Sequence, residues 1–63
     1  MKVYKLSGGA YTSSLFVETM DGIYVENEEF GFFKHPTIQT QEQLLAHMRN
    51  MEEDGLTVEV YVI

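Results

Sequence analysis

The segment at residues 40–55, TQEQLLAHMRNMEEDG, constrains the fold more than any other part of the sequence. Thr40, followed three residues later by Gln43, forms a capping box, and Gly55 is typical of the position just past a helix end. The apolar side chains that recur at helical spacing between them are Leu44, Leu45, Met48 and Met51. The pattern predicts a helix over Gln41–Glu53, which is too short to be stable alone and must pack on another element.

The remaining segments alternate apolar and polar residues or are rich in β-branched and aromatic residues, and both patterns predict strands. The strands are expected at residues 2–6, 11–19, 22–27 and 56–63, with a break at residues 7–10. Residues 28–37 contain three phenylalanines, but Gly31 and Pro36 limit them to a short or edge strand. We therefore predict one α+β domain over residues 1–63: a small antiparallel-rich sheet of three to five strands, in the order β-β-β-(β)-α-β, with one amphipathic helix on one face.

The register of the hairpin near Gly22 decides which side chains face the core, because a slip of one residue moves every side chain to the other face. A three-residue loop over residues 20–22 pairs Val17 with Val25 and gives Gly22 a left-handed conformation. The alternative turn at residues 21–22 places a carboxylate on the core face. We therefore predict the three-residue loop. The core face then holds Leu15, Val17, Ile23 and Val25.

A single helix can cover only one face of such a sheet, so the other face is expected to be open. The same parity assigns four large side chains to that face, with Tyr4 as a further candidate. They are Phe16, Tyr24, Tyr61 and Ile63. Glu18, Glu26 and Glu59 share the parity, so aromatic and acidic side chains are mixed there. Exposed apolar patches on small proteins commonly mark interfaces, which predicts a homodimer or partner contact through this face.

The charge balance excludes several function classes. Ten acidic residues against four basic ones give a formal net charge of −6, with no basic stripe. Direct binding to nucleic acid or to an anionic membrane is therefore not expected. No apolar run approaches the roughly 18 residues of a membrane-spanning helix, and the N-terminus does not resemble a secretory signal. The absence of cysteine excludes disulfides, thiolate zinc sites and cysteine nucleophiles. We expect a soluble, cytoplasmic protein.

Catalytic and metal-binding motifs are not found in the sequence. His35 and His47 are not spaced as metal ligands, and the glycine-rich residues 7–14 lack the lysine of a phosphate-binding loop. A chain of this size does not readily enclose a pocket of about 300 Å³ or more. We therefore predict no cofactor, no metal and no enzymatic activity. An enzyme or ligand-binding module built around the two histidines at a subunit interface is the remaining alternative.

Two acidic clusters stand out in the sequence. They are Glu26, Glu28 and Glu29, and Glu52, Glu53 and Asp54. The second cluster lies at a helix C-terminus, where negative charge lowers the stability of the helix. Residues that lower local stability without a local gain are found at functional surfaces, so this cluster is a candidate binding site. The clusters predict a protein-binding inhibitor whose carboxylates imitate nucleic-acid phosphates and occupy a basic surface of a partner protein.

In size, charge and lack of cysteine the chain resembles inhibitors encoded by phages and mobile elements, of which anti-CRISPR proteins are one group. That resemblance implies a phage or mobile-element origin and action in a host cytoplasm. The alternative function is a non-catalytic structural or assembly protein that forms a homodimer through the open sheet face.

Overall fold

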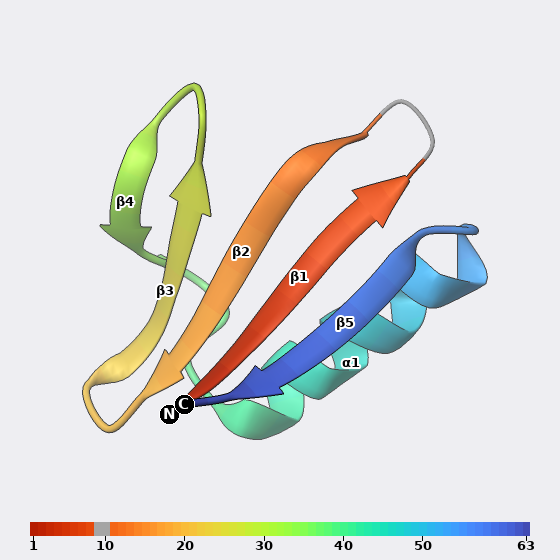
Figure 1. Ribbon diagram of the computed structural model, residues 1–63. Coiled ribbons are helices and arrows are strands. Elements are labelled where there is room, and N and C mark those ends of the chain that lie inside the picture. The colour runs from red at the N-terminus through yellow and green to blue at the C-terminus, as the bar shows by residue number, and fades with distance from the viewer. Residues whose placement is uncertain (9–10) are drawn as a thin grey trace.

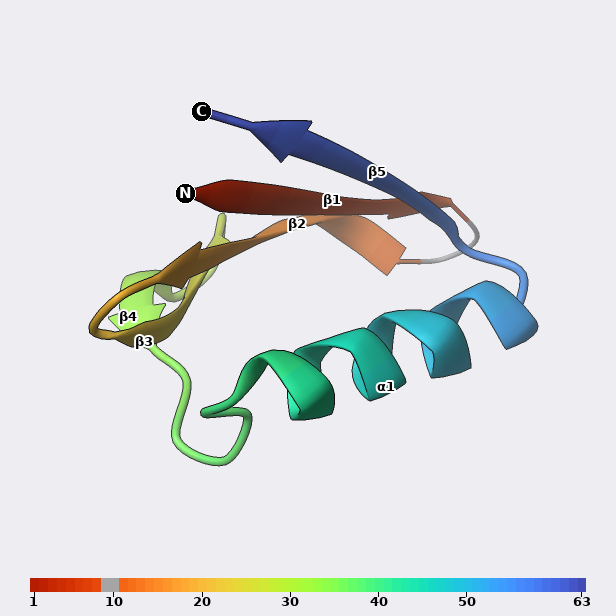
Figure 2. The same ribbon diagram turned by 90° about the horizontal axis from the view of Figure 1, so that it is seen from below.

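The computed structural model describes the backbone of residues 1–8 and 11–63, and the side chains of residues 1–8 and 14–63. The described residues form one helix and a five-stranded sheet in the order β4-β3-β2-β1-β5, and all neighbouring strands run antiparallel. The elements are β1 (Lys2–Gly8), β2 (Tyr11–Thr19), β3 (Gly22–Asn27), β4 (Gly31–Lys34), α1 (Gln41–Glu53) and β5 (Thr57–Val62). Figures 1 and 2 show α1 on one face of the sheet, between β4 and β5 in the chain. The predicted α+β fold is confirmed, with β4 as an edge strand. The predicted break at residues 7–10 begins later than expected, because β1 continues to Gly8; Gly9 and Ala10 lie outside the described residues.

Helix α1 has the predicted bounds because local capping groups define its start. The Thr40 hydroxyl accepts a hydrogen bond from the Gln43 backbone N–H at 3.2 Å, and the Gln43 side-chain oxygen accepts from the Thr40 N–H at 3.1 Å. These reciprocal bonds satisfy backbone donors that have no partner inside the helix. No helix among the described residues is long and apolar enough to cross a membrane.

The β2–β3 hairpin differs from the prediction in its register. Thr19 pairs with Gly22, so the loop contains only Met20 and Asp21, and Phe16 rather than Val17 lies opposite Val25. Gly22 does take the expected positive φ, at 133°. The prediction of a three-residue loop assumes that no carboxylate lies on the core face, and that assumption is wrong because a buried hydroxyl partner accommodates Glu18 there.

The helix-covered face forms the core. Its buried hydrophobic side chains are Tyr4, Leu6, Phe16, Ile23, Val25, Leu44 and Met48, and Ile38, Met51, Leu56 and Val58 pack at its margin. The prediction that Leu15 and Val17 share this face is wrong, while the prediction for Ile23 and Val25 is confirmed. Phe16 carries more apolar surface than Val17, and its burial stabilises the observed register.

Candidate partner-binding surfaces

The acidic cluster at the end of α1 is compatible with a stable helix because backbone groups cap the helix carbonyls. The Gly55 N–H donates to the Glu52 carbonyl and the Leu56 N–H donates to the Met51 carbonyl, each at 3.0 Å. Gly55 has φ of 91°, so the arrangement is a Schellman motif. The last turn contains no basic side chain. The helix end therefore does not depend on a basic side chain for its carbonyls, and the side chains of Glu52, Glu53 and Asp54 are exposed.

The second acidic cluster lies around the turn between β3 and β4. The Asn27 side-chain oxygen accepts hydrogen bonds from the Glu29 N–H at 2.8 Å and the Phe30 N–H at 3.3 Å. This side-chain to backbone bonding is characteristic of an Asx turn. Glu26 is the exposed residue just before Asn27, and Glu28 and Glu29 are exposed within the turn. A defined local structure therefore presents these carboxylates to solvent.

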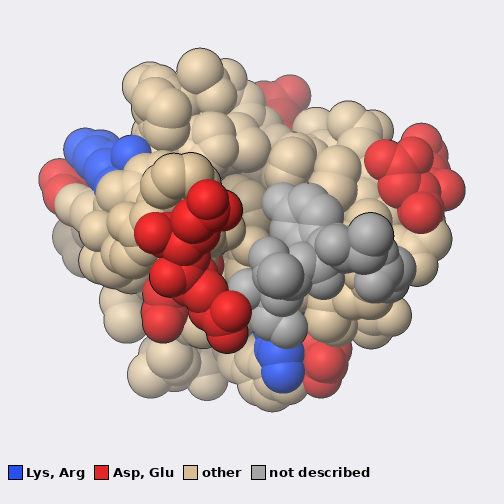
Figure 3. Space-filling view, turned by 90° about the horizontal axis from the view of Figure 1, so that it is seen from above, with Lys and Arg blue, Asp and Glu red and all other residues tan. Residues whose placement is uncertain are grey.

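The fold brings these two clusters to the same end of the molecule. Strand β3 and helix α1 both end there, as does β1, while β4 and β5 begin there (Figure 1). Figure 3 views this end and shows separate groups of acidic side chains over the β3–β4 connection and over the end of α1. The basic side chains visible in that view lie toward its margin. Residues about 25 positions apart in sequence thus lie at the same end of the molecule, in two separate acidic groups. We call this set the acidic end: Glu26, Glu28, Glu29, Glu52, Glu53 and Asp54.

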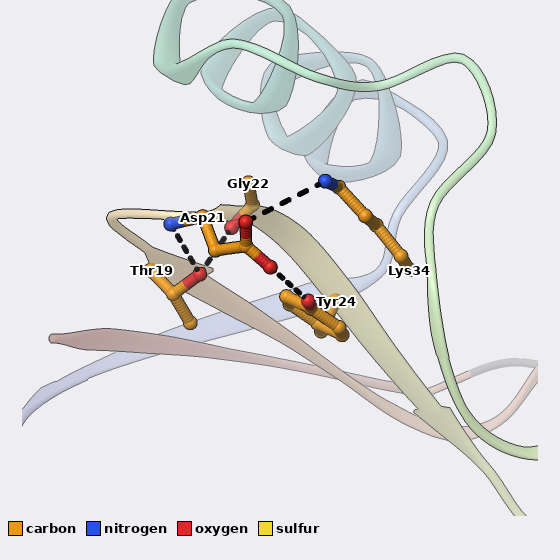
Figure 4. A network of polar contacts seen from close by, with 5 residues as sticks. All are labelled: Thr19, Asp21, Gly22, Tyr24 and Lys34. Carbon is orange, nitrogen blue, oxygen red and sulfur yellow. Dashed lines mark hydrogen bonds and ion pairs between the residues drawn. The ribbon is translucent and has the colours of Figure 1, made fainter.

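The carboxylates of the acidic end form no ion pair with another described residue. The one ion pair among the described residues joins Lys34 Nζ and Asp21 Oδ1 at 3.9 Å, at the opposite end of the sheet. There the Tyr24 hydroxyl donates to Asp21, and the Thr19 hydroxyl donates to the Gly22 carbonyl at 2.8 Å (Figure 4). The hydrogen bond to Asp21 is the main reason that the pKa of Tyr24 is raised above 10.0. The two ends of the sheet therefore differ: one has a paired carboxylate and the other has unpaired ones.

The open sheet face has a different composition from the predicted one. Phe16 lies in the core at 4% exposure, so its assignment to the open face is wrong, and the same correction applies to Tyr4 and Glu18. Tyr24 and Tyr61 do lie on the open face. The cross-strand row that contains them runs Tyr61, Val3, Val17, Tyr24 and Lys34. Ile63 follows β5 and is 77% exposed.

The second row of the open face is mixed in charge. It runs Glu59, Lys5, Leu15, Glu26 and Phe32. Phe32 extends the face onto β4, where its ring stacks on Tyr24 with centroids 5.2 Å apart. The Tyr61 hydroxyl donates to Glu59 at 2.7 Å, and this bond is the main cause that raises the pKa of Tyr61. The predicted alternation of side chains along β2 is reversed in the structure, so Leu15 and Val17 lie on the open face instead of the core face.

Both histidine rings lie close to the Phe16 ring, which the sequence does not indicate. The ring centroids of His35 and His47 lie 6.2 Å and 5.4 Å from that of Phe16. His35 Nδ1 accepts hydrogen bonds from the Thr37 N–H at 3.1 Å and the Ile38 N–H at 2.9 Å. Burial lowers the pKa of His35 below 6.5, and the nearby His47 lowers it further. His35 is thus a structural residue of the β4–α1 connection rather than an exposed loop residue.

The part of the chain that the structure describes has surface hollows but no cluster of metal-binding groups. The described residues contain no group of three or more histidine, aspartate or glutamate side chains that could hold a metal ion. An open hollow with a volume of about 740 Å³ lies at the end of the sheet opposite the acidic end. Its lining residues are Met1, Lys2, Glu18, Thr19, Met20 and Asp21.

Comparison of the chain with family models, curated proteins and solved structures finds no match.

Proposed function

We propose that this chain is a small acidic inhibitor that binds a basic, nucleic-acid-binding surface of another protein through its acidic end. The observation that carries the proposal is the placement of two sequence-distant carboxylate clusters at one end of the fold, without ion pairs to other described residues. An unpaired carboxylate offers a guanidinium or ammonium group a partner without first breaking an internal salt bridge.

The charge distribution supports fast and salt-sensitive binding. A net charge of −6 accelerates encounter with a basic partner, and screening by salt weakens that attraction. The capped helix end and the Asx turn hold the backbone of both clusters, so little backbone entropy is lost when the carboxylates bind. The carboxylates would occupy positions that nucleic-acid phosphates take on the same partner.

The test is a pull-down from host lysate with the wild-type chain, followed by elution with increasing salt and by elution with double-stranded DNA. The proposal predicts a nucleic-acid-binding protein that both salt and DNA release. The paired variant Glu52→Lys and Glu53→Lys is the decisive one, because positive charge at a helix C-terminus is favourable and the fold is retained. This variant and the turn variant Glu28→Lys with Glu29→Lys should each weaken retention strongly.

The matched control for the single variant Glu52→Lys is Glu42→Lys, which makes the same change in net charge in the first turn of α1, away from the acidic end. It should retain the partner at nearly wild-type strength, whereas Glu52→Lys should weaken retention. Equal loss of binding in these two single variants would show that only net charge matters, and unchanged binding in the paired variants would exclude the acidic end as the contact.

A further inference from the structure

The two edges of the sheet are protected to very different degrees. Strand β4 has four residues, begins with Gly31, ends with Lys34 and is soon followed by Pro36, all of which discourage pairing with another chain. Strand β5 has six residues, TVEVYV, without lysine, proline or glycine. Val60 and Val62 are 53% and 76% exposed there. Only β5 therefore retains the features of an edge that accepts another strand.

The backbone groups that β5 leaves free follow from its pairing with β1. The Ile63 N–H donates to the Met1 carbonyl at 2.9 Å, and the Met1 amino group donates back to the Ile63 carbonyl at 3.4 Å. Hydrogen-bonded and non-hydrogen-bonded pairs alternate along an antiparallel ladder. Because the register has no irregularity, the N–H and C=O groups of Val58, Val60 and Val62 point away from β1. They have no hydrogen-bond partner among the described residues.

Helix α1 lies beside part of this edge, where Leu45 and Arg49 line a hollow with Val60, but it leaves the second half of β5 largely exposed. Figure 2 shows that β5 begins close to the end of α1 and then diverges from the helix toward its own end. Val58, near the start of the strand, packs at the margin of the core, whereas more than half of the surface of Val60 and of Val62 is exposed. A second strand can therefore approach this part of β5 without displacing the helix.

We propose that β5 pairs with β5 of a second copy of this chain, antiparallel and about a twofold axis at Val60. In that register Val60 faces itself and Val58 faces Val62 of the partner subunit, so all the free backbone groups find partners. Tyr61 lies directly opposite the partner's Glu59 in a close, non-hydrogen-bonded pair. In this arrangement the Tyr61 hydroxyl can donate either to Glu59 of its own chain or to the partner's Glu59.

Electrostatics disfavours one of the two neighbouring registers, and the other, which pairs Val60 with Val62 of the partner subunit, leaves the backbone groups of Val58 without a partner in β5. A shift that pairs Val58 with Val60 of the partner subunit would place Glu59 directly opposite the partner's Glu59, and like charges there are destabilising. The antiparallel arrangement also places the acidic residues beside the start of one β5 next to the end of the other β5, so these clusters of the two copies stay apart. The two net charges of −6 still repel at long range, so salt should strengthen the dimer. Salt should weaken binding through the acidic end, which is the opposite dependence. The two proposals can therefore be tested independently of each other.

The first test uses the wild-type protein and needs no substitution. Amide hydrogen exchange, followed by NMR at low and high protein concentration, should show Val58, Val60 and Val62 becoming protected as concentration rises. The amides of Glu59 and Tyr61 face β1 and should be protected at both concentrations. Sedimentation equilibrium on the same samples should report a monomer–dimer equilibrium that shifts toward the dimer with salt.

Two proline variants then compare the two edges. Val60→Pro removes an N–H that faces away from β1, a position where an edge strand tolerates proline. It should weaken dimerisation by roughly ten- to a hundredfold, since each copy loses one backbone hydrogen bond. Phe32→Pro is the matched control on β4, because Phe32 lies in a non-hydrogen-bonded pair with Glu26 and its N–H also faces outward. It should leave dimerisation unchanged.

Single cysteines test the register in a chain that has no cysteine of its own. Val60→Cys should form a symmetric disulfide, because directly opposite Cα atoms lie about 5.5 Å apart, within disulfide range. Val62→Cys places its sulfurs roughly 13 Å apart along the strands and should not. A chain that stays monomeric at millimolar concentration overturns the proposal and leaves a strand of a different protein as the candidate occupant. A dimer that resists Val60→Pro, or one that crosslinks through Val62→Cys instead, also overturns it.

Discussion

The Tyr4 hydroxyl donates a hydrogen bond to Glu18 Oε1 at 3.1 Å on the helix-covered face of the sheet. Tyr4 is 3% exposed and Glu18 is half-buried, so the bond satisfies a carboxylate close to the core. Burial raises the pKa of Tyr4 above 10.0, and Glu18 raises it further through the hydrogen bond and its charge. This pair is the physical reason that β2 can place Phe16 in the core, because Glu18 necessarily shares that face.

Removing the hydroxyl with Tyr4→Phe should lower the free energy of unfolding by about 1 kcal/mol, since Glu18 loses its partner while the ring still packs. Tyr61→Phe removes an equivalent bond to Glu59 at an exposed site and should change stability much less than Tyr4→Phe does. Urea denaturation of both variants provides the comparison. Equal effects would show that the partial burial of Glu18 contributes nothing.

Gly22→Ala should destabilise the protein by at least about 2 kcal/mol, because φ of 133° is a backbone conformation that non-glycine residues rarely adopt. An added Cβ would also lie 2.8 Å from Lys34 Cε and disturb the ion pair with Asp21. Gly31 also has a positive φ, of 78°, but nothing lies within 4 Å of the position that an added Cβ would take there. Gly31→Ala should therefore cost less, about 1 kcal/mol. Chemical denaturation that ranks the two variants in the opposite order contradicts this account of the hairpin.

Thr40→Ala should lower the free energy of unfolding by about 1 kcal/mol through loss of the helix cap. Gln43→Ala removes the reciprocal bonds, which the Gln43 side chain makes to the Thr40 and Gln39 N–H groups. A double-mutant cycle with both changes should give a nonzero coupling energy, because the two residues form one capping box. Thr40→Ser keeps the hydroxyl and should stay close to the wild type.

Lowering the pH from about 7 to 5 should reduce stability through His35, whose ordinary pKa of 6.5 is lowered in the folded protein by burial and by His47. The unfolded chain then binds the proton more readily, so stability is complete above the unfolded pKa and is lost as pH falls below it. Protonation also disrupts the Nδ1 bonds to the Thr37 and Ile38 N–H groups.

His35→Asn is the control, because its oxygen can accept the same backbone bonds as Asn27 does in the β3–β4 turn and does not titrate. Thermal denaturation across this pH range should show a smaller loss of stability in the variant than in the wild type. The same slope in both proteins would show that His35 is not the source of the pH dependence.

Much of the fold could be predicted because its signals are local. The capping box at Thr40 and the positive φ of Gly55 depend on residues within one turn, and the bounds of α1 follow from them. The bounds of β2 and β3 likewise follow from β-branched residues and a glycine. The face of Phe16 could not be predicted in this way, because it depends on Tyr4, twelve residues earlier in the chain, as a hydrogen-bond donor for Glu18.

Residue types and short spacings are enough to specify the acidic composition, the single helix and the succession of elements along the chain. Long-range packing places the β3–β4 connection and the end of α1 at the same end of the molecule, brings the rings of His35 and His47 close to Phe16, and leaves β5 as an edge strand. These relationships depend on the spatial order and register of the strands. Order and register are set by contacts between side chains that are distant in sequence, which local patterns do not specify.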